Sequence, residues 1–235
     1  MRYLFLLLWG AFGGPLSAQP APSFAVAPGI DYTYRTLGEG RALLENERGV
    51  LVPRYGVVYS QPLSDRVFLS VGVNYVSSGY QTELADLRYA SEFDPITFEY
   101  TPDPALGGLD LRTIDRFLEV PVSARLRLGD AANAFQPYLG IGGAALFYIN
   151  TYQNVDVTTG SDRAVFISDA GFRSLQFAAI LQAGLSYTGM ERVHWFVQPT
   201  GRFHLTPDAP KDVTTLWDLH RYSVGLVLGG RYQLK

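Results

Sequence analysis

The chain has 235 residues, no cysteine and a formal net charge of −3. The lack of cysteine excludes a disulfide framework and a thiolate metal site, and the weak negative charge gives no indication of nucleic-acid binding. The basic residues are 17 Arg and only two Lys, which indicates that much of the surface does not face water.

The first segment, "MRYLFLLLWGAFGGPLSA", has the layout of a secretory signal peptide: Arg2, an apolar run and then small residues. We predict cleavage after Ala18, so that 1–18 is a signal peptide and 19–235 is one outer-membrane domain. An exported chain without disulfides suits a bacterial envelope. No later stretch has 18 or more consecutive apolar residues. A membrane could therefore be crossed only by a β-barrel.

The remaining chain has the residue pattern of β-strands almost throughout. In the segment 66–79, Val67, Leu69 and Val71 alternate with small or polar residues, and 173–188 and 219–234 follow the same rule. Successive strand side chains point to opposite faces, so each strand has one apolar face. In 135–152 apolar residues occupy both odd and even positions, so which face of this strand is apolar stays ambiguous. We predict eight strands, at about 24–36, 49–61, 66–79, 113–128, 135–152, 173–188, 193–206 and 219–234.

The connections between these strands alternate strictly between short and long. Turns at 63–65, 129–134 and 189–192 are short, whereas the connections at 37–48, 80–112, 153–172 and 207–218 are long. Outer-membrane barrels have this layout, with short periplasmic turns and long external loops. The predicted fold is all-β: a monomeric, eight-stranded antiparallel up-and-down transmembrane β-barrel in the bacterial outer membrane.

A soluble exported barrel of the lipocalin kind is the competing architecture, with its apolar face turned inward around a ligand. Three features favour the membrane version. The polar faces are rich in Gly, Ser and Arg. The strands have 12 or more residues, whereas about 9–11 suffice to cross a bilayer. Aromatic residues such as Tyr32, Tyr138 and Tyr187 lie near predicted strand ends, as in interfacial girdles.

Two adjacent segments resemble a known family. "FLEVPVSARLRLG" at 117–129 and "FQPYLGIGGAALFYI" at 135–149 are similar to the PorT-like outer-membrane β-barrel family of Bacteroidota. Its members carry an aromatic-aliphatic-Glu-aliphatic-Pro strand followed by a Lys/Gln-Pro-Tyr strand. The resemblance implies an integral outer-membrane protein, in a family whose members mostly have no known enzymatic role. The chain ends "RYQLK" where a terminal aromatic is usual, so Tyr232 is the candidate signal for the barrel-assembly machinery.

Charges in the strands are expected to face the barrel interior, because Arg on the lipid face at mid-membrane costs about 2–4 kcal/mol. An eight-stranded barrel is just wide enough for its own side chains. We therefore predict a structural plug rather than a pore, with Glu119 paired to Arg54 or Arg202, and with Arg125 and Arg127 lacking an acidic partner. The predicted interior network is Asp31, Arg35, Arg54, Glu119, Arg125, Arg127, Gln182, Gln198, Arg202 and Arg231, accompanied by Gln176 and Arg221.

No catalytic, metal-binding or cofactor-binding motif is present: HExxH, GxSxG and phosphate loops are missing. We therefore expect no enzyme. An outer-membrane lipid-modifying enzyme with a rim site near His204, Thr206 and Glu119 is the alternative. The connection 80–112 is rich in carboxylates and aromatics, and it is our first choice as contact surface for an envelope or extracellular protein. The other expected partners are membrane lipid and the assembly machinery, with no nucleic acid.

Overall fold

The structure is a computed structural model. It describes residues 21–36, 47–85, 92–93, 95–97, 100–101, 108–130, 132–157, 163–167, 174–189, 192–206 and 220–234. The predicted signal peptide lies outside these residues. Within the described part of the chain, no helix has the length and hydropathy needed to span a bilayer.

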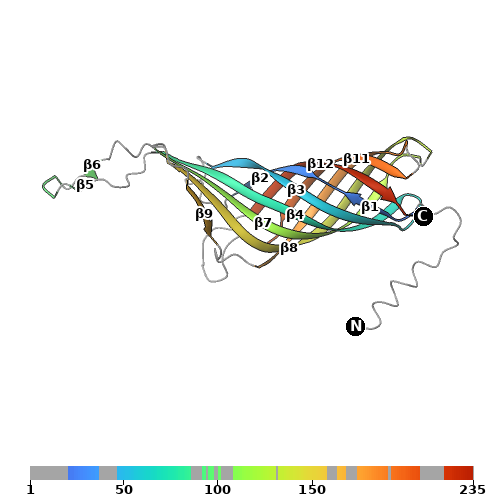
Figure 1. Cartoon of the computed structure of the whole chain (residues 1–235), viewed down its shortest axis with the longest axis horizontal. Coiled ribbons are helices and arrows are strands. Elements are labelled where there is room, and N and C mark those ends of the chain that lie inside the picture. Colours follow the sequence, from blue (N-terminus) through green and yellow to red (C-terminus); the bar gives the residue numbers. More distant parts are fainter. Residues whose placement is uncertain are drawn as a thin grey trace, which may run out of the picture.

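The described elements are strands; all but β5 and β6, which form a separate two-stranded sheet, belong to one closed antiparallel sheet. They are β1 (Ser23–Val26), β2 (Gly29–Thr36), β3 (Glu47–Pro62), β4 (Val67–Ala85), β5 (Glu92–Phe93), β6 (Tyr100–Thr101), β7 (Gly108–Arg127), β8 (Phe135–Val157), β9 (Arg163–Ile167), β10 (Leu175–Tyr187), β11 (Val193–His204) and β12 (His220–Gln233). The order around the sheet is β1-β12-β11-β10-β8-β7-β4-β3-β2. Because β1 also pairs with β3, and β2 with β12, the sheet closes into a barrel (Figure 1). Strand β9 pairs with β8, and β5 pairs with β6.

The first predicted strand, 24–36, is divided in the structure. Ala27 and Pro28 separate β1 from β2, since proline has no N–H to donate to the ladder. Hydrogen bonding nevertheless continues past the break: Ala27 N donates to Gly56 O at 2.9 Å, and Leu228 N donates to Pro28 O at 3.0 Å. Both segments thus lie between β3 and β12. The closed order consequently contains nine strand segments.

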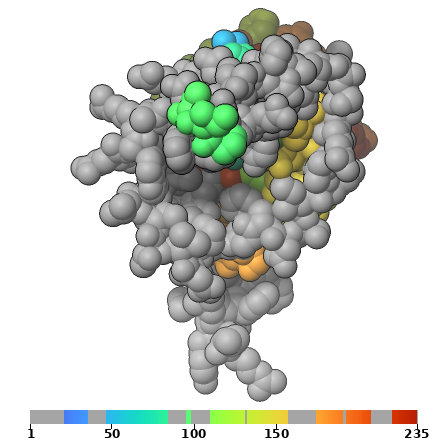
Figure 2. Space-filling model, turned by 90° about the vertical axis from the view of Figure 1, so that its left-hand side faces the viewer, coloured from blue at the N-terminus to red at the C-terminus, as the bar shows by residue number. Residues whose placement is uncertain are grey.

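The sheet has two unlike ends. At one end lie the short turns that join β3 to β4, β7 to β8 and β10 to β11, together with the last described backbone, where Leu234 N donates to Pro22 O at 2.8 Å. We call this the short-turn end. The opposite end, the long-connection end, faces the viewer in Figure 2, where described residues of the 92–101 segment (green) and of β8 (yellow) are visible. The predicted alternation of short and long connections is present.

Three strands extend further than expected at the long-connection end (Figure 1). β4 has 19 residues, β7 has 20 and β8 has 23. The predicted connections 80–112 and 153–172 are therefore wrong at their borders, where residues belong to strands. The predicted connection 37–48 is wrong in the same way, because Glu47 and Arg48 belong to β3. These extensions carry polar cross-strand contacts, for example where Gln81 Nε2 donates to Asp110 Oδ2 at 2.6 Å. Their apolar alternation is short, as in Leu109 and Leu111 of β7, and too brief to predict a strand.

The two faces of the wall follow the predicted alternation. In β7, Leu118, Val122 and Leu126 are exposed on the outside, whereas Glu119 and Arg125 are buried inside. The outer face is thus apolar and the inner face largely polar. This is the arrangement expected of a wall between lipid and a polar interior.

A bulge explains why β8 had no clear parity. Phe117 pairs with Tyr148 and Arg116 with Asn150, which leaves Ile149 as an extra residue of β8. Below the bulge even-numbered residues such as Leu146 are buried, and above it the buried residue is Thr151. The change of face within one strand hides the period of two.

Exposed aromatic side chains occur toward both ends of the wall. Phe24, Phe135, Tyr187, Trp195 and Tyr232 lie near the short-turn end, and Tyr32 and Tyr34 lie toward the long-connection end. Tyr138 is an exception, and its prediction as a girdle residue is wrong. Its ring points inward over Gly184, where a Cβ atom would collide with it.

Candidate functional site: the charged interior

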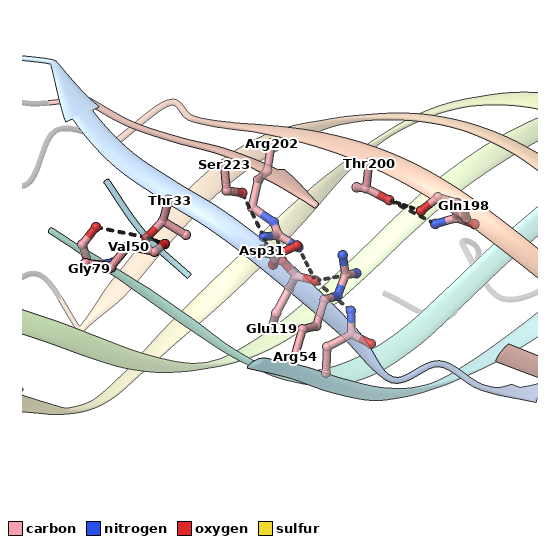
Figure 3. Close-up of polar contacts among 11 residues, drawn as sticks. Asp31, Thr33, Val50, Arg54, Gly79, Glu119, Gln198, Thr200, Arg202 and Ser223 are labelled. Carbon is pink, nitrogen blue, oxygen red and sulfur yellow. Dashed lines mark hydrogen bonds and ion pairs between the residues drawn. The ribbon is translucent and has the colours of Figure 1, made fainter. Parts of the chain in front are cut away.

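Four predicted network residues meet in the middle of the interior (Figure 3). Arg202 Nε lies 2.8 Å from Glu119 Oε2, and Arg202 Nη1 lies 3.1 Å from Asp31 Oδ2. Arg54 Nη2 lies 3.3 Å from Glu119 Oε1. The cluster comes from β2, β3, β7 and β11, so these ion pairs connect strands on different sides of the barrel. We call these four residues the central cluster.

Neutral polar groups complete the central cluster. Asn74 Nδ2 donates to Glu119 Oε1 at 2.6 Å, and Arg202 Nη1 donates to Ser223 Oγ at 3.1 Å. Glu119 has no exposed surface and Asp31 is 1% exposed. Two carboxylates face two guanidinium groups, so the formal charges cancel. Buried charges require this kind of compensation, because an unpaired ion in a low-dielectric interior is strongly destabilising.

A second group of charges lies toward the long-connection end. Arg221 Nη1 lies 2.5 Å from Asp115 Oδ2, and the Thr151 hydroxyl donates to the same carboxylate. Arg35 forms an ion pair with Glu47, and its guanidinium lies 3.4 Å from the centre of the Tyr80 ring. Arg35 is therefore paired, but with a residue outside the central cluster.

Between these two groups the interior also holds apolar side chains. Val76, Phe117, Leu146 and Ala178 pack together, and each is at most 2% exposed. The His204 ring packs edge-on against Phe117 with 6.2 Å between ring centroids. Hydrocarbon thus fills the section above the central cluster, where no ion pair is described.

The remaining predicted network residues lie nearer the short-turn end, away from the central cluster. Tyr138 donates its hydroxyl proton to Gln198 Oε1 at 2.9 Å, and Gln198 Nε2 donates to Thr200 Oγ1 at 3.2 Å. Gln182 is buried beside Arg125. Among the described residues no carboxylate lies within ion-pair distance of Arg125, Arg127 or Arg231.

Two small cavities lie inside the described part of the barrel. One, of about 20 Å³, lies among Arg54, Asn74, Arg125 and Gln182. A second, of about 30 Å³, lies among Arg125, Arg127 and Arg231. A much larger hollow, of about 700 Å³, runs along the wall and is lined mainly by outward-facing side chains such as Leu139, Ile141 and Leu181. Room for a bulky ligand is therefore found on the outside of the wall.

The residues considered for catalysis do not form a triad in the described structure. His204 is 2% exposed, and its Nδ1 lies 3.4 Å from Gln176 Oε1. The Thr206 hydroxyl accepts a hydrogen bond from Phe177 N at 2.9 Å, so it is directed toward the backbone. Within the described ranges, no hydroxyl hydrogen-bonds to the His204 ring, and no group of three or more His, Asp or Glu residues could hold a metal.

Sequence reasoning missed three members of the interior network. Asn74 and Asp115 have the parity of the inward faces of their strands, and that signal could have identified both. Glu47 fell within a predicted connection, so no parity applied to it. Because Glu47 and Asp115 were not predicted, Arg35 and Arg221 had no predicted partners.

Comparisons with known proteins agree with this architecture. The model of the "Outer membrane protein beta-barrel domain" family matches residues 51–207. No curated protein matches the chain significantly in sequence.

Three solved structures illustrate the likeness in fold. The N-terminal β-barrel domain of Pseudomonas aeruginosa OprF is 14% identical, with a TM-score of 0.39, over 91% of this chain and 100% of that one. Neisserial surface protein A is 15% identical, with a TM-score of 0.40, over 90% and 97%. The outer membrane enzyme PagL is 12% identical, with a TM-score of 0.34, over 89% and 99%. Identities this low carry no information about role.

The family match covers more than half of the chain and includes most strands of the closed sheet. Its description agrees with the apolar outer face and the paired charges inside. The chain belongs to the outer membrane protein beta-barrel domain family and is a protein of the bacterial outer membrane.

Proposed function

We propose that this protein is an eight-stranded barrel with a structurally plugged interior, and that it acts through contacts made by its long-connection end rather than through transport or catalysis. The count of eight takes β1 and β2 as one wall strand, since both lie between β3 and β12. The short-turn end then faces the periplasm, as in other outer-membrane barrels.

The observation that supports a plug is the central cluster. Glu119, Asp31, Arg54 and Arg202 are almost fully buried and mutually paired, and the described cavity beside Arg54 holds only about 20 Å³. A cavity needs about 10–15 Å³ to hold one water molecule. A continuous file of water and ions would require these ion pairs to separate.

Single-channel recording in planar lipid bilayers tests the plug. We expect no conductance steps from the folded wild-type protein in 1 M KCl. The double variant Glu119→Ala/Arg202→Ala removes the two side chains that meet at mid-barrel, and it should conduct if it folds. Regular conductance steps from the wild type would overturn the proposal.

Contacts made at the long-connection end are supported by the extended strands β4, β7 and β8, which carry the sheet beyond β2, β11 and β12 at this end of the barrel (Figure 1). This extension carries charged side chains, as in the ion pair of 3.0 Å between Arg48 Nη1 and Glu83 Oε1. Ile96, in the adjoining connection, is 87% exposed. A side chain exposed to this degree is accessible to a partner protein.

Photo-crosslinking in intact cells of the source bacterium tests this contact surface. Benzoylphenylalanine at position 96 should give an adduct with an envelope or extracellular protein. The matched control places the same group at position 141, where Ile141 is 65% exposed on the outer wall and should meet lipid. The same adducts at both positions, or none at position 96, would contradict the proposal.

We also propose that the chain is one of the PorT-like barrels of Bacteroidota, on the basis of the residues at 117–149. We propose in addition that it has no enzymatic activity. The lack of activity is supported by the burial of His204 and by the direction of the Thr206 hydroxyl. The soluble ligand-binding barrel, in contrast, is ruled out by the outer-membrane location.

A further inference from the structure

Three arginines surround one small cavity at the short-turn end of the interior. Arg125 and Arg127 of β7 and Arg231 of β12 line a space of about 30 Å³ together with Gln136, Tyr138 and Ser186. Arg125 is 7% exposed. Strands β7 and β12 are not neighbours in the sheet, so the three positive charges converge from different sides of the barrel.

These arginines are not compensated as the other interior arginines are. Arg54, Arg202 and Arg221 each lie within 3.3 Å of a carboxylate oxygen. The six ion pairs among the described residues include none of the three around the cavity. The Nε atoms of all three, and Nη2 of Arg231, are buried without a hydrogen-bond acceptor in the described structure.

Aromatic rings and amide or carbonyl groups are their described neighbours. The Arg125 guanidinium lies 5.8 Å from the centre of the Tyr138 ring, that of Arg127 5.7 Å from Phe68, and that of Arg231 5.4 Å from Phe196. Arg127 also donates to Asp65 O and, at 3.5 Å, to Gln136 Oε1. Such contacts attract a cation but leave its net charge in place.

Electrostatics therefore requires a counter-charge here. A guanidinium does not lose its proton in proteins, so neutralisation by deprotonation is excluded. Like charges around one partly buried cavity repel one another, and unsatisfied buried N–H groups add to the cost. An anion in the cavity would accept hydrogen bonds from these donors and offset the repulsion.

We propose that this cavity is a binding site for one small inorganic anion of the size of chloride. Its volume, about 30 Å³, is about two to three times the minimum that holds a single water molecule. A sugar, a nucleotide or a lipid headgroup is too large for it. The anion would take the place that Glu119 and Asp31 occupy in the central cluster, and it would stabilise the short-turn end of the barrel.

Chloride-35 NMR of the refolded protein in a non-ionic detergent tests the site directly. Bound chloride relaxes rapidly, so the wild type should broaden the chloride signal in a saturable manner. The double variant Arg125→Gln/Arg231→Gln keeps polar side chains of moderate size and should lose the saturable broadening. The matched control Arg48→Gln removes an arginine whose side chain is 68% exposed, and it should behave like the wild type. Equal saturable broadening from the double variant would overturn the proposal.

A second measurement uses only the wild type, in case the double variant does not fold. The temperature at which heated samples lose the gel mobility of the folded barrel is compared in sodium chloride and in sodium gluconate at the same ionic strength. Gluconate is too large for the cavity, so the unfolding temperature should be higher in chloride. The same temperature in both salts would refute a specific anion site, since general screening is held constant.

Discussion

Glu119 Oε2 lies 2.8 Å from Arg202 Nε, although the two residues are 83 positions apart and belong to strands that do not pair. Glu119 also contacts Arg54 and Asn74, so one carboxylate links β3, β4, β7 and β11. A side chain that joins four strands across the interior should contribute more to stability than any surface ion pair.

Replacing Glu119 by Ala should destabilise the barrel strongly. Removal of one partner leaves two guanidinium groups underneutralised, and breaking a buried pair costs about 3–5 kcal/mol. The measurement is urea-induced unfolding in lipid vesicles, followed by heat-modifiable gel mobility. The matched control is Glu83→Ala, which removes a half-exposed carboxylate paired with Arg48 and should cost at most about 1 kcal/mol. Equal losses of unfolding free energy in the two variants would show that the central cluster stabilises the barrel no more than a surface ion pair does.

A charge placed on the outer face should lower the free energy of unfolding by an amount that depends on its depth in the membrane. Val122→Arg puts a guanidinium on the exposed face of β7 three residues from Glu119 of the central cluster, where a mid-membrane charge costs about 2–4 kcal/mol. Leu128→Arg, at the short-turn end of the same face, should cost about 0–1 kcal/mol. Tryptophan fluorescence during unfolding from vesicles measures both. A smaller cost for Val122→Arg than for Leu128→Arg would mean that this face is not the lipid face.

Gly225 is needed because the Asp31 side chain passes directly over it. A Cβ atom at Gly225 would meet the Asp31 carboxylate and lie 2.8 Å from Ile30 O. Gly225→Ala should therefore push Asp31 away from Arg202 and cost about 1–3 kcal/mol, the usual range for overpacking. Gly201→Ala is the control, since a Cβ atom there meets nothing within 4 Å and should change the free energy of unfolding by less than about 0.5 kcal/mol. A neutral Gly225→Ala variant would argue against a tightly packed Asp31.

Phe117 should behave as a core residue although its sequence neighbour faces lipid. Phe117 is 1% exposed and packs on Val76, Leu146 and Ala178, so Phe117→Ala should cost about 3–5 kcal/mol through the cavity that it leaves. Leu118→Ala, at a 41% exposed position of the outer wall, should cost less because lipid can fill the space. Equilibrium unfolding of both variants under identical conditions compares them, and the reverse order of costs would be inconsistent with the inward orientation of Phe117.

The extended strands show one limit of the sequence pattern. β4, β7 and β8 run past the predicted boundaries because cross-strand polar pairs such as Gln81 with Asp110 hold them together. The apolar alternation in these extensions covers only two residues a strand, such as Leu109 and Leu111 in β7. An alternation this short does not distinguish a strand from a connection.

The amino-acid sequence by itself determined which face of most strands is apolar and the alternation of short and long connections, because side-chain direction in a strand depends only on local backbone geometry. It also placed Asp31, Arg54, Glu119 and Arg202 in the interior and paired Glu119 with Arg54 or Arg202. The tertiary structure decided that Glu119 contacts both arginines and that Asp31 contacts Arg202. Asp31 and Arg202 are 171 positions apart, and their meeting depends on how the strands are staggered around the closed sheet. The same geometry brings Arg125 and Arg231 to one cavity with no described carboxylate beside them, since distances across a closed barrel are set by the whole sheet and by no single strand.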